Sequence, residues 1–373
     1  MSQKPIRVLQ VGMSDNYGGT EATIYGIYNH LDHSKIQFDF LNVYGHPIAR
    51  QSELEASGAH VYDLLLKRRE GYQTYVRGIK DFYKKHAGEF DVVQCNIQCL
   101  DQIDMARYAK QFGVKKTIVY AHNAGHGIAP SKMAALAIRW NKLFSHHYVD
   151  QYAGCSRLAV EFAFSKKDAK QAAVINTGIE TSNFVFSEEK RNLFRQRFSY
   201  SNHLTVYGSA GRFDPQKNQT FLLKIFSEIH QRNPNARFFL SGRGPMESIL
   251  RDQVHQMGLD SVCLIVTEFL DYQAFYSGID AFILPSRFEG LGVVLVEAQC
   301  AGLVCFASQN TIPEEAKILD SFQFIPLSFS ASKWADCILS ANLSRCHDSS
   351  FNQAKRDIQD ATRSYTRMVE GLL

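Results

Sequence analysis

The sequence predicts an α/β protein with two domains, each built on a parallel β-sheet. The chain has 373 residues, more than a single hydrophobic core usually serves, and 45% of them are apolar. Short apolar segments typical of buried strands alternate with longer helical segments along the whole chain. Glycine-rich turns follow several of these strands, as they do at the ligand-binding edge of parallel sheets.

The amino-acid composition disfavours several classes of protein. The charged fraction of 21% and the absence of low-complexity tracts indicate an ordered chain, and a net charge of +4 does not indicate a nucleic-acid-binding protein. The eight cysteines are scattered among apolar residues without metal-ligand spacing, so we expect reduced, mostly buried thiols and no metal site. No apolar run approaches about 18 residues, and no signal peptide opens the chain, so a cytoplasmic location is expected.

The first half begins with a strand at Ile6–Val11, a loop over residues 12–19 and a helix from Thr20 to Leu31. The loop is too long for the G-x-G-x-x-G fingerprint, which disfavours a nicotinamide or flavin enzyme. His122 directly follows a strand at 116–121, at the edge where ligands of parallel sheets bind. Further strands are predicted at 38–43, 60–65 and 91–95, and helices at 51–57, 72–86, 102–112 and 132–148.

The second half repeats this pattern. A strand at Thr205–Ala210 leads into a turn that carries Arg212 and Lys217, ahead of a helix at 219–232. Two cations at a strand end suit a diphosphate, which a single charge would hold loosely, although both also fit an ordinary surface turn. The next strand, near residues 237–240, ends in a second glycine turn at Gly242.

The most informative segment is the run from Pro285 to Gly302, PSRFEGLGVVLVEAQCAG. It predicts a loop after a buried strand, then a helix that starts near Gly290 and carries Glu297 about two turns further on. Unpaired N–H groups at a helix start bind phosphate, and Glu289 lies at the mouth of the loop. The same pattern also occurs in many α/β domains that bind nothing there. The phosphate-binding positions predicted at this helix start are Gly290, Leu291, Gly292 and Val293.

This segment, with P-S-x-x-E-G-x-G, seven residues between Glu289 and Glu297, and A-x-x-A-G, resembles the E-x7-E signature of the retaining family 4 glycosyltransferases. The resemblance implies the GT-B fold, two Rossmann-like domains facing a central cleft. It also implies that Glu289 contacts the transferred sugar, while Glu297 reaches sugar hydroxyls of the nucleotide. The run Thr311–Ala316 looks like the I-P-E-E loop of members from bacterial capsular and exopolysaccharide clusters.

Other motifs match the same family in the same order. Gly18-Gly19-Thr20-Glu21 resembles its G-G-x-E, which implies contact with the donor phosphates. The G-R-x-x-x-x-K motif implies that Arg212 and Lys217 neutralise the leaving diphosphate, and His122 is implied to approach the transferred sugar. The implied catalytic set is Glu289, His122, Arg212 and Lys217. The implied donor-binding set adds Gly18, Gly19, Gly242, Phe269, Leu270, Gly290, Leu291, Gly292, Val293 and Glu297.

The domain boundary is predicted from Asn176–Glu180, which resembles the N-G-V-D that closes the first domain in the family. We expect an N-terminal acceptor-binding domain at 1–180 and a linker between about Ile179 and Phe198. A nucleotide-sugar-binding domain follows at 199–356. A C-terminal helix at 357–373 is expected to cross back to the first domain.

The resemblance implies transfer, with retention, of a hexose or N-acetylhexosamine from a nucleotide sugar, expected to be UDP-linked. The expected acceptor is a glycan, lipid-linked, in cell-surface polysaccharide biosynthesis. No metal cofactor is expected, because two cations and a helix start can neutralise the departing diphosphate. Residues 1–180 carry 22 Lys and Arg against 17 Asp and Glu, which suits peripheral contact with the inner face of the cell membrane, although solvated helix ends would look the same.

Two other functions stay open at this point. A sugar-nucleotide epimerase of the same fold would need acid and base carboxylates in the first domain, and none can be placed there. A catalytically silent GT-B-like partner of another transferase would not need Glu289, Glu297, Arg212 and Lys217 together.

Overall fold

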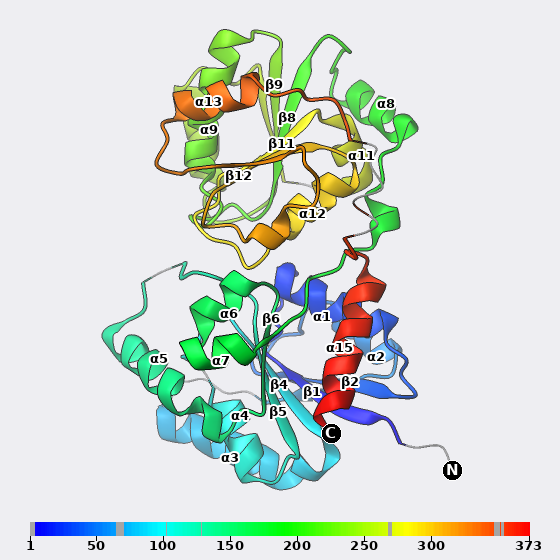
Figure 1. Ribbon diagram of the computed structural model, residues 1–373, viewed down its shortest axis with the longest axis vertical. Coiled ribbons are helices and arrows are strands. Elements are labelled where there is room, and N and C mark those ends of the chain that lie inside the picture. Colours follow the sequence, from blue (N-terminus) through cyan, green and yellow to red (C-terminus); the bar gives the residue numbers. More distant parts are fainter. Residues whose placement is uncertain are drawn as a thin grey trace. The chain divides into compact units, whose positions relative to one another are not determined.

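The computed structural model describes residues 4–64, 71–101, 103–127, 129–267, 271–346, 351 and 354–373. The chain divides into two compact units (Figure 1). The first comprises Met1–Gly178 with Ile358–Leu373, and the second comprises Ile179–Asp357. Each unit is a parallel sheet with helices on both faces, so the predicted fold class is confirmed.

The first unit has a seven-stranded parallel sheet in the described residues, with the order β3-β2-β1-β4-β5-β6-β7. The strand order reverses between β1 and β4, and ligands of such sheets bind at the carboxyl ends of the strands beside this reversal. The central strands are buried on both faces, which explains their continuous apolar sequences. The strands are β1 (Ile6–Val11), β2 (Ile36–Asn42), β3 (Val61–Asp63), β4 (Val92–Ile97), β5 (Lys116–Ala121), β6 (Gln151–Gly154) and β7 (Ala173–Val174).

Serines begin three helices of the first unit: the hydroxyls of Ser131, Ser156 and Ser165 each accept a hydrogen bond from the N–H three residues on. The C-terminal helix packs against α1, where Gly26 leaves room for the Ile358 side chain. The last helix of the chain therefore belongs to the first unit. The helices are α1 (Gly19–His30), α2 (Gln51–Ala56), α3 (Tyr72–His86), α4 (Asp104–Gln111), α5 (Lys132–Phe144), α6 (Arg157–Ala163), α7 (Lys166–Gln171) and α15 (Ile358–Leu372).

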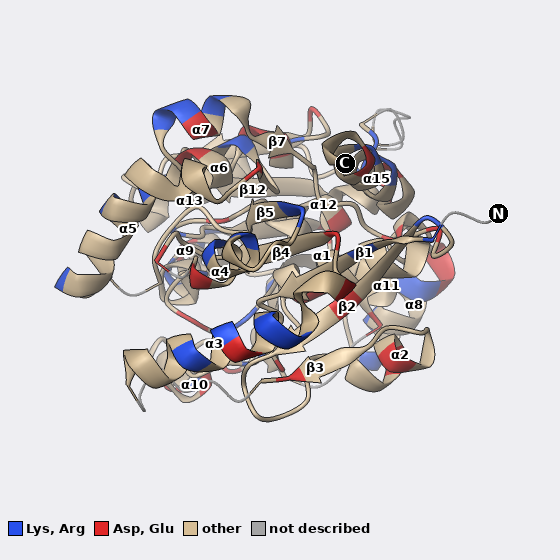
Figure 2. Ribbon diagram, turned by 90° about the horizontal axis from the view of Figure 1, so that it is seen from below, with Lys and Arg blue, Asp and Glu red and all other residues tan. Residues whose placement is uncertain are grey.

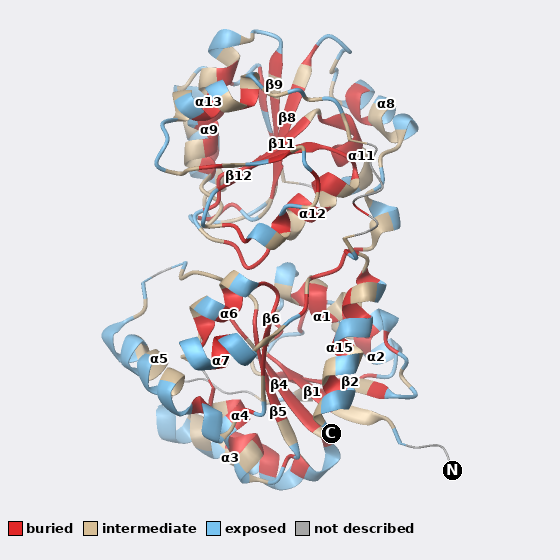
Figure 3. Ribbon diagram, in the orientation of Figure 1, coloured by how far each residue is buried: buried red, intermediate tan, exposed pale blue. Residues whose placement is uncertain are grey.

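In the part of the second unit that the structure describes, the parallel sheet has six strands in the order β10-β9-β8-β11-β12-β13, which reverses between β8 and β11. Its four central strands are largely buried, and α9, α10 and α13 share a hydrophobic core on one face (Figure 3). The strands are β8 (Thr205–Ala210), β9 (Ala236–Ser241), β10 (Cys263–Val266), β11 (Ala281–Leu284), β12 (Val304–Ser308) and β13 (Phe322–Ile325). The helices are α8 (Glu188–Arg197), α9 (Gln219–Arg232), α10 (Glu247–Gln256), α11 (Tyr272–Gly278), α12 (Val293–Cys300) and α13 (Ala331–Leu339).

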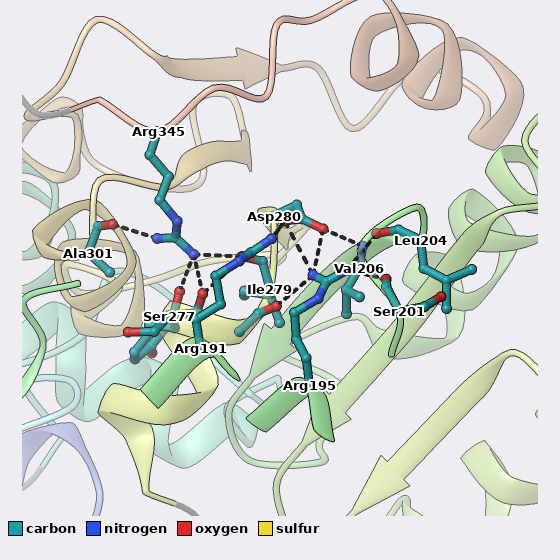
Figure 4. Close-up of polar contacts among 12 residues, drawn as sticks. Arg191, Arg195, Ser201, Leu204, Val206, Ser277, Ile279, Asp280, Ala301 and Arg345 are labelled. Carbon is teal, nitrogen blue, oxygen red and sulfur yellow. Dashed lines mark hydrogen bonds and ion pairs between the residues drawn. The ribbon is translucent and has the colours of Figure 1, made fainter. Parts of the chain in front are cut away.

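The segment between Ile179 and Phe198, expected to be a linker, instead contains α8 and is part of the second unit. Figure 4 shows the reason, because two arginines of α8 converge on the carboxylate of Asp280, just before β11. Arg191 Nη2 lies 2.8 Å from Asp280 Oδ1, and Arg195 Nη1 lies 3.2 Å from Asp280 Oδ2. Since Arg195 is buried, this ion pair fixes α8 to the sheet.

Candidate functional site

The loops after β8 and β11 lie side by side where the strand order of the second unit reverses. The backbone N–H of Arg287 donates to the carbonyl oxygen of Gln216 at 2.8 Å. The side-chain amide of Asn218 donates to the carbonyl oxygen of Pro285 at 3.0 Å. Two motifs about 70 residues apart in sequence therefore form one surface at the position where parallel sheets bind ligands.

Lys217 and Glu289 form an ion pair at the centre of this surface. Lys217 Nζ lies 2.7 Å from Glu289 Oε1, and the two side chains are only 15% and 6% exposed. The amide of Gln216 donates to the other carboxylate oxygen, Glu289 Oε2, at 3.4 Å and to the carbonyl oxygen of Phe288 at 3.1 Å. Both oxygens of the Glu289 carboxylate are thus held in a defined orientation.

Arg212 lies at the rim of the same loop. Its Nε lies 2.6 Å from Asp214 Oδ2, and more than half of the Arg212 side chain, 55%, is exposed. The other oxygen of Asp214 accepts the backbone N–H groups of Gln216 at 3.0 Å and Lys217 at 3.2 Å. Asp214 therefore shapes the turn that presents both predicted cations, while the guanidinium of Arg212 stays accessible to an anion.

Glu297 lies on α12 and accepts a hydrogen bond from the buried hydroxyl of Tyr276 on α11, at 2.6 Å from Oε2. Burial raises the pKa of Glu297 to about 7, against the opposing effects of the Tyr276 hydroxyl and the Lys217 cation. Near neutral pH the carboxyl group is therefore present in both its protonated and its ionised form.

The helix after the second loop begins later than we expected. Gly292 has φ 79° and precedes α12, whose first residue is Val293 instead of Gly290. The left-handed conformation at Gly292 turns the chain sharply, and a glycine accepts it without strain. Glu297 consequently lies about one turn into the helix, so the expected two turns were wrong. Leu291 is buried, which leaves its backbone as the part able to contact a ligand.

Arg345 joins the helices that carry this tyrosine and glutamate (Figure 4). Its Nη2 donates to the carbonyl oxygens of Tyr276, Ser277 and Ile279 at 2.7–2.8 Å, and its Nη1 donates to Ala301 at 2.6 Å. These carbonyls lie at or just beyond the carboxyl ends of α11 and α12, where a cation is favoured. Burial lowers the pKa of Arg345 to about 10, so it remains cationic near neutral pH.

Gly242 has a packing role. A Cβ atom at Gly242 would lie 2.0 Å from the carbonyl oxygen of Gly211, so the loop after β9 contacts the loop after β8 directly. That contact explains the glycine without a ligand, and its predicted part in donor binding stays a prediction. Phe269 and Leu270, the predicted contacts to the base, lie outside the described residues.

His122 follows β5 in the first unit and lies 2.9 Å from Asn96, through its Nε2 and the amide oxygen Oδ1. Because an amide oxygen only accepts, His122 Nε2 must carry the proton and Nδ1 must be the free acceptor. The Asn96 amide in turn donates to Gln10 Oε1 at 3.0 Å. Burial lowers the pKa of His122 to about 3, so its ring is neutral near neutral pH.

Gly18 and Gly19 begin α1, at the carboxyl end of β1. The buried carboxylate of Glu21 accepts the N–H groups of Gly18 and Ser14, at 3.1 and 3.0 Å, which closes the loop before the helix. A Cβ atom at Gly19 would meet no atom within 4 Å. Packing within the chain therefore does not require glycine at position 19.

The predicted residues fall into two groups, one in each unit. The structure brings Arg212, Lys217 and Glu289 together, with Glu297 on the adjoining helix, whereas His122, Gly18 and Gly19 belong to the sheet edge of the first unit. Sequence reasoning missed the partners that orient these side chains: Asn96, Asp214, Gln216 and Tyr276. Asn96 has a usable signal in the sequence, because like His122 it directly follows a predicted strand. Tyr276 has none, because its sequence context is that of an ordinary core aromatic residue. No cluster of His, Cys, Asp or Glu that could hold a metal ion occurs within the described residues.

Comparison with known proteins indicates the class of protein to which this fold and site correspond. Residues 190–342, which span most of the second unit, match the model of the family described as glycosyl transferases group 1. The fold of the whole chain resembles that of Anabaena HepE, solved in complex with UDP and glucose, with a TM-score of 0.72 and 16% identity over 97% of this chain and 95% of HepE. The two units thus have the GT-B fold.

Two curated relatives make the similarity more specific. The putative glycosyltransferase EpsF of Bacillus subtilis is 26% identical over 343 residues, which cover 91% of this chain and 89% of EpsF. The UDP-Gal:alpha-D-GlcNAc-diphosphoundecaprenol alpha-1,3-galactosyltransferase of Escherichia coli is 23% identical over 205 residues, 54% of this chain and 53% of that enzyme. Fold, family match and relatives together support a glycosyltransferase as the class of this protein.

Proposed function

We propose that this protein is a retaining, metal-independent glycosyltransferase that uses a UDP-linked hexose or N-acetylhexosamine. The observation that carries the proposal is the arrangement of Arg212, Lys217, Glu289 and Glu297 on two adjoining loops and one helix start. The UDP and glucose bound to HepE and the UDP-Gal donor of the E. coli relative support a UDP donor. The name of that relative also supports a lipid-diphosphate-linked glycan as acceptor. EpsF and that relative are the basis for proposing a role in cell-surface polysaccharide synthesis.

In this proposal, the donor diphosphate lies over the loop from Glu289 to Gly292 and contacts the backbone at the start of α12. Arg212 and Lys217 stabilise the negative charge that grows on the diphosphate as the bond to the sugar breaks. A phosphate oxygen of the leaving group accepts the proton of the attacking hydroxyl group, and attack on the same face retains the anomeric configuration. Protein cations supply the neutralising charge, so the reaction needs no metal ion.

The remaining predicted residues position the donor. Glu289, oriented by Lys217 and Gln216, accepts hydrogen bonds from hydroxyls of the transferred sugar. Glu297 accepts the ribose hydroxyls, and its hydrogen bond to Tyr276 fixes the carboxylate for that contact. His122 offers a neutral ring with Nδ1 as acceptor for a sugar hydroxyl, while Gly18 and Gly19 leave space for the donor phosphates.

The first test of this proposal is ligand-induced stabilisation followed by transfer. UDP-sugars are expected to raise the melting temperature, because a ligand at about 100 times its Kd adds about 2.7 kcal/mol to stability. GDP-sugars should shift it less. Transfer or slow donor hydrolysis should then persist in EDTA; complete loss of activity that magnesium restores would contradict metal independence. Interconversion of a UDP-sugar without acceptor would favour an epimerase, and binding without any turnover would favour a silent partner protein.

The raised pKa of Glu297 predicts a pH dependence of donor binding. The ionised Glu297 accepts hydrogen bonds from two ribose hydroxyls better than the protonated form, which has fewer acceptor sites, so the Kd for an intact UDP-sugar should fall as pH rises through about 7. Between pH 8 and pH 6 we expect the binding of the UDP-sugar to weaken about tenfold, since protonation of Glu297 then competes with UDP-sugar binding. Calorimetric titration of wild type and Glu297→Gln measures this, and the variant should show no such step.

Tyr276→Phe provides a matched control for this pH dependence. The Tyr276 hydroxyl lowers the pKa of Glu297, so its removal should move the step in Kd to higher pH without abolishing it. A step of equal size at the same pH in Glu297→Gln would show that another group titrates.

The proposed location is the inner face of the cell membrane, where a lipid-linked acceptor would lie. Among the described residues, no helix is both long and apolar enough to cross a membrane. Contact with the lipid would therefore be peripheral in this proposal, through the basic first unit.

A further inference from the structure

Helix α5 exposes most of its large apolar side chains. Met133, Leu136, Trp140 and Leu143 are 84%, 68%, 61% and 58% exposed, and none of the residues of the helix is buried. Their spacing of three and four residues places all four on one face of the helix. Phe144 extends the same face, so the exposed surface is a continuous apolar stripe along α5. We call this stripe, Met133, Leu136, Trp140, Leu143 and Phe144, the α5 face.

Two polar side chains of α5 bond directly to the first unit. The amide of Asn141 donates to the carbonyl oxygen of Leu100 at 2.8 Å, and Lys142 Nζ donates to that of Phe162 at 2.6 Å. A surface helix normally packs its apolar side inward and exposes its polar side. In α5 most of the large apolar side chains are exposed instead, and the less exposed side is mixed, with Ala134, Ala137 and Ile138 partly buried beside the two polar side chains. An apolar patch of this kind on a protein surface marks an interaction site.

Basic residues lie on α5 itself and on the neighbouring helices α4 and α3. Helix α5 contains no Asp or Glu, and α4 lies between α3 and α5, as two surface pockets show. One pocket, of about 320 Å³, is lined by Arg107 of α4 together with Trp140 and Phe144 of α5. Figure 2 shows the basic segments on these three helices. Against two acidic residues, Asp81 and Asp104, α3, α4 and α5 carry Arg77, Lys80, Lys84, Lys85, Arg107, Lys110, Lys132, Arg139 and Lys142.

We propose that the α5 face docks this protein on an anionic lipid bilayer. An apolar stripe rimmed by Lys and Arg is the pattern of a helix that lies in the membrane interface, with Trp and Leu at the boundary of headgroups and acyl chains. The basic residues of α3, α4 and α5 lie near the anionic headgroups, where each contributes to binding. This partner rests on the proposed lipid-linked acceptor, which such docking would bring within reach. A second copy fits less well, because a symmetric contact through this face would bring the same cations together.

The chain offers an internal probe for the test. It has two tryptophans, and Trp334 is fully buried in the core of the second unit, so a change of tryptophan emission on lipid addition reports Trp140. The full-length protein is mixed with vesicles of phosphatidylcholine alone or with phosphatidylglycerol added. We expect a blue shift and co-sedimentation with the anionic vesicles only, both reduced by salt.

Two substitutions on the α5 face and one matched control sharpen the experiment. Leu136→Ser and Trp140→Ser should each weaken binding to anionic vesicles severalfold, and the double variant should weaken it more than about tenfold. Leu193→Ser, which changes an exposed leucine of α8, should bind as wild type does. Arg139→Gln should weaken binding about fivefold, since a basic residue near the surface contributes a factor of that size.

Unchanged Trp140 emission with anionic vesicles, or equal binding by wild type and the double variant, would overturn the proposal. A wild-type dimer that Leu136→Ser converts to a monomer in light scattering would also overturn it, in favour of self-association. An assay of donor hydrolysis in solution tests the proposed glycosyltransferase activity independently of membrane docking. The α5 variants should hydrolyse donor at the wild-type rate, so loss of vesicle binding with intact hydrolysis supports docking, whereas absent hydrolysis in wild type contradicts only the proposed activity.

Discussion

Arg212→Ala is expected to lower kcat by about 100-fold or more, the scale of a lost charge contact to a transition state. The Arg212 side chain is largely exposed and its ion pair with Asp214 lies at the surface, so the melting temperature should hardly change. Loss of turnover with intact stability would then identify a role in catalysis. Steady-state kinetics with the preferred UDP-sugar and a thermal melt measure the two effects separately.

Lys217→Ala should lose turnover to a similar degree but should also be less stable. Its partner Glu289 is buried, and breaking a buried pair by removing one member costs about 3–5 kcal/mol. Lys224→Ala is the matched control, because Lys224 is an exposed lysine of α9, further along the same helix that follows the loop. Wild-type kcat in both Arg212→Ala and Lys217→Ala would contradict the proposed neutralisation of the diphosphate.

Substitutions of Glu289 and Glu297 should affect different kinetic constants. Glu289→Gln keeps the shape of the side chain but removes its charge and weakens its contact with Lys217 Nζ. Because we propose that Glu289 orients the sugar while the bond breaks, this variant should lower kcat more than it raises KM. Glu297→Gln should mainly raise KM, because hydrogen bonds to ribose persist in both the ground state and the transition state.

Both constants should be measured for both variants at pH 8, where wild-type Glu297 is mostly ionised. A binding defect in Glu289→Gln together with a turnover defect in Glu297→Gln would mean that the two roles are exchanged. Glu53→Gln serves as the control, since Glu53 is an exposed residue of α2 in the first unit.

Local sequence patterns determined much of the fold. The apolar runs at Ile6–Val11 and Thr205–Ala210 predict buried strands, because parallel strands covered on both faces need a continuous apolar sequence. The loops after these two strands are predicted to lie at the ligand-binding edges of the two sheets. In the structure each loop lies beside a reversal of strand order. Helix α8 lies where the sequence suggests a linker, although Ser187 followed by Glu188 and Glu189 is a helix-start signal.

The site itself was only partly readable from the sequence. Spacing and residue type made Arg212, Lys217, Glu289 and Glu297 candidates, but the same residues also fit surface turns and a solvated helix, so the family resemblance was needed to select them. Their partners are distant in sequence: 72 residues separate Lys217 from Glu289, and 21 separate Tyr276 from Glu297. No local pattern encodes such pairs.

Only the tertiary structure determines the properties of a side chain that depend on its surroundings. The pKa of Glu297 near 7 and the neutral ring of His122 result from burial, which the packing of the whole unit sets. The proton on His122 Nε2 follows from one hydrogen bond to Asn96. The outward apolar face of α5 could not be read from its amphipathic sequence, since periodicity shows that a helix has an apolar side but not which way that side points.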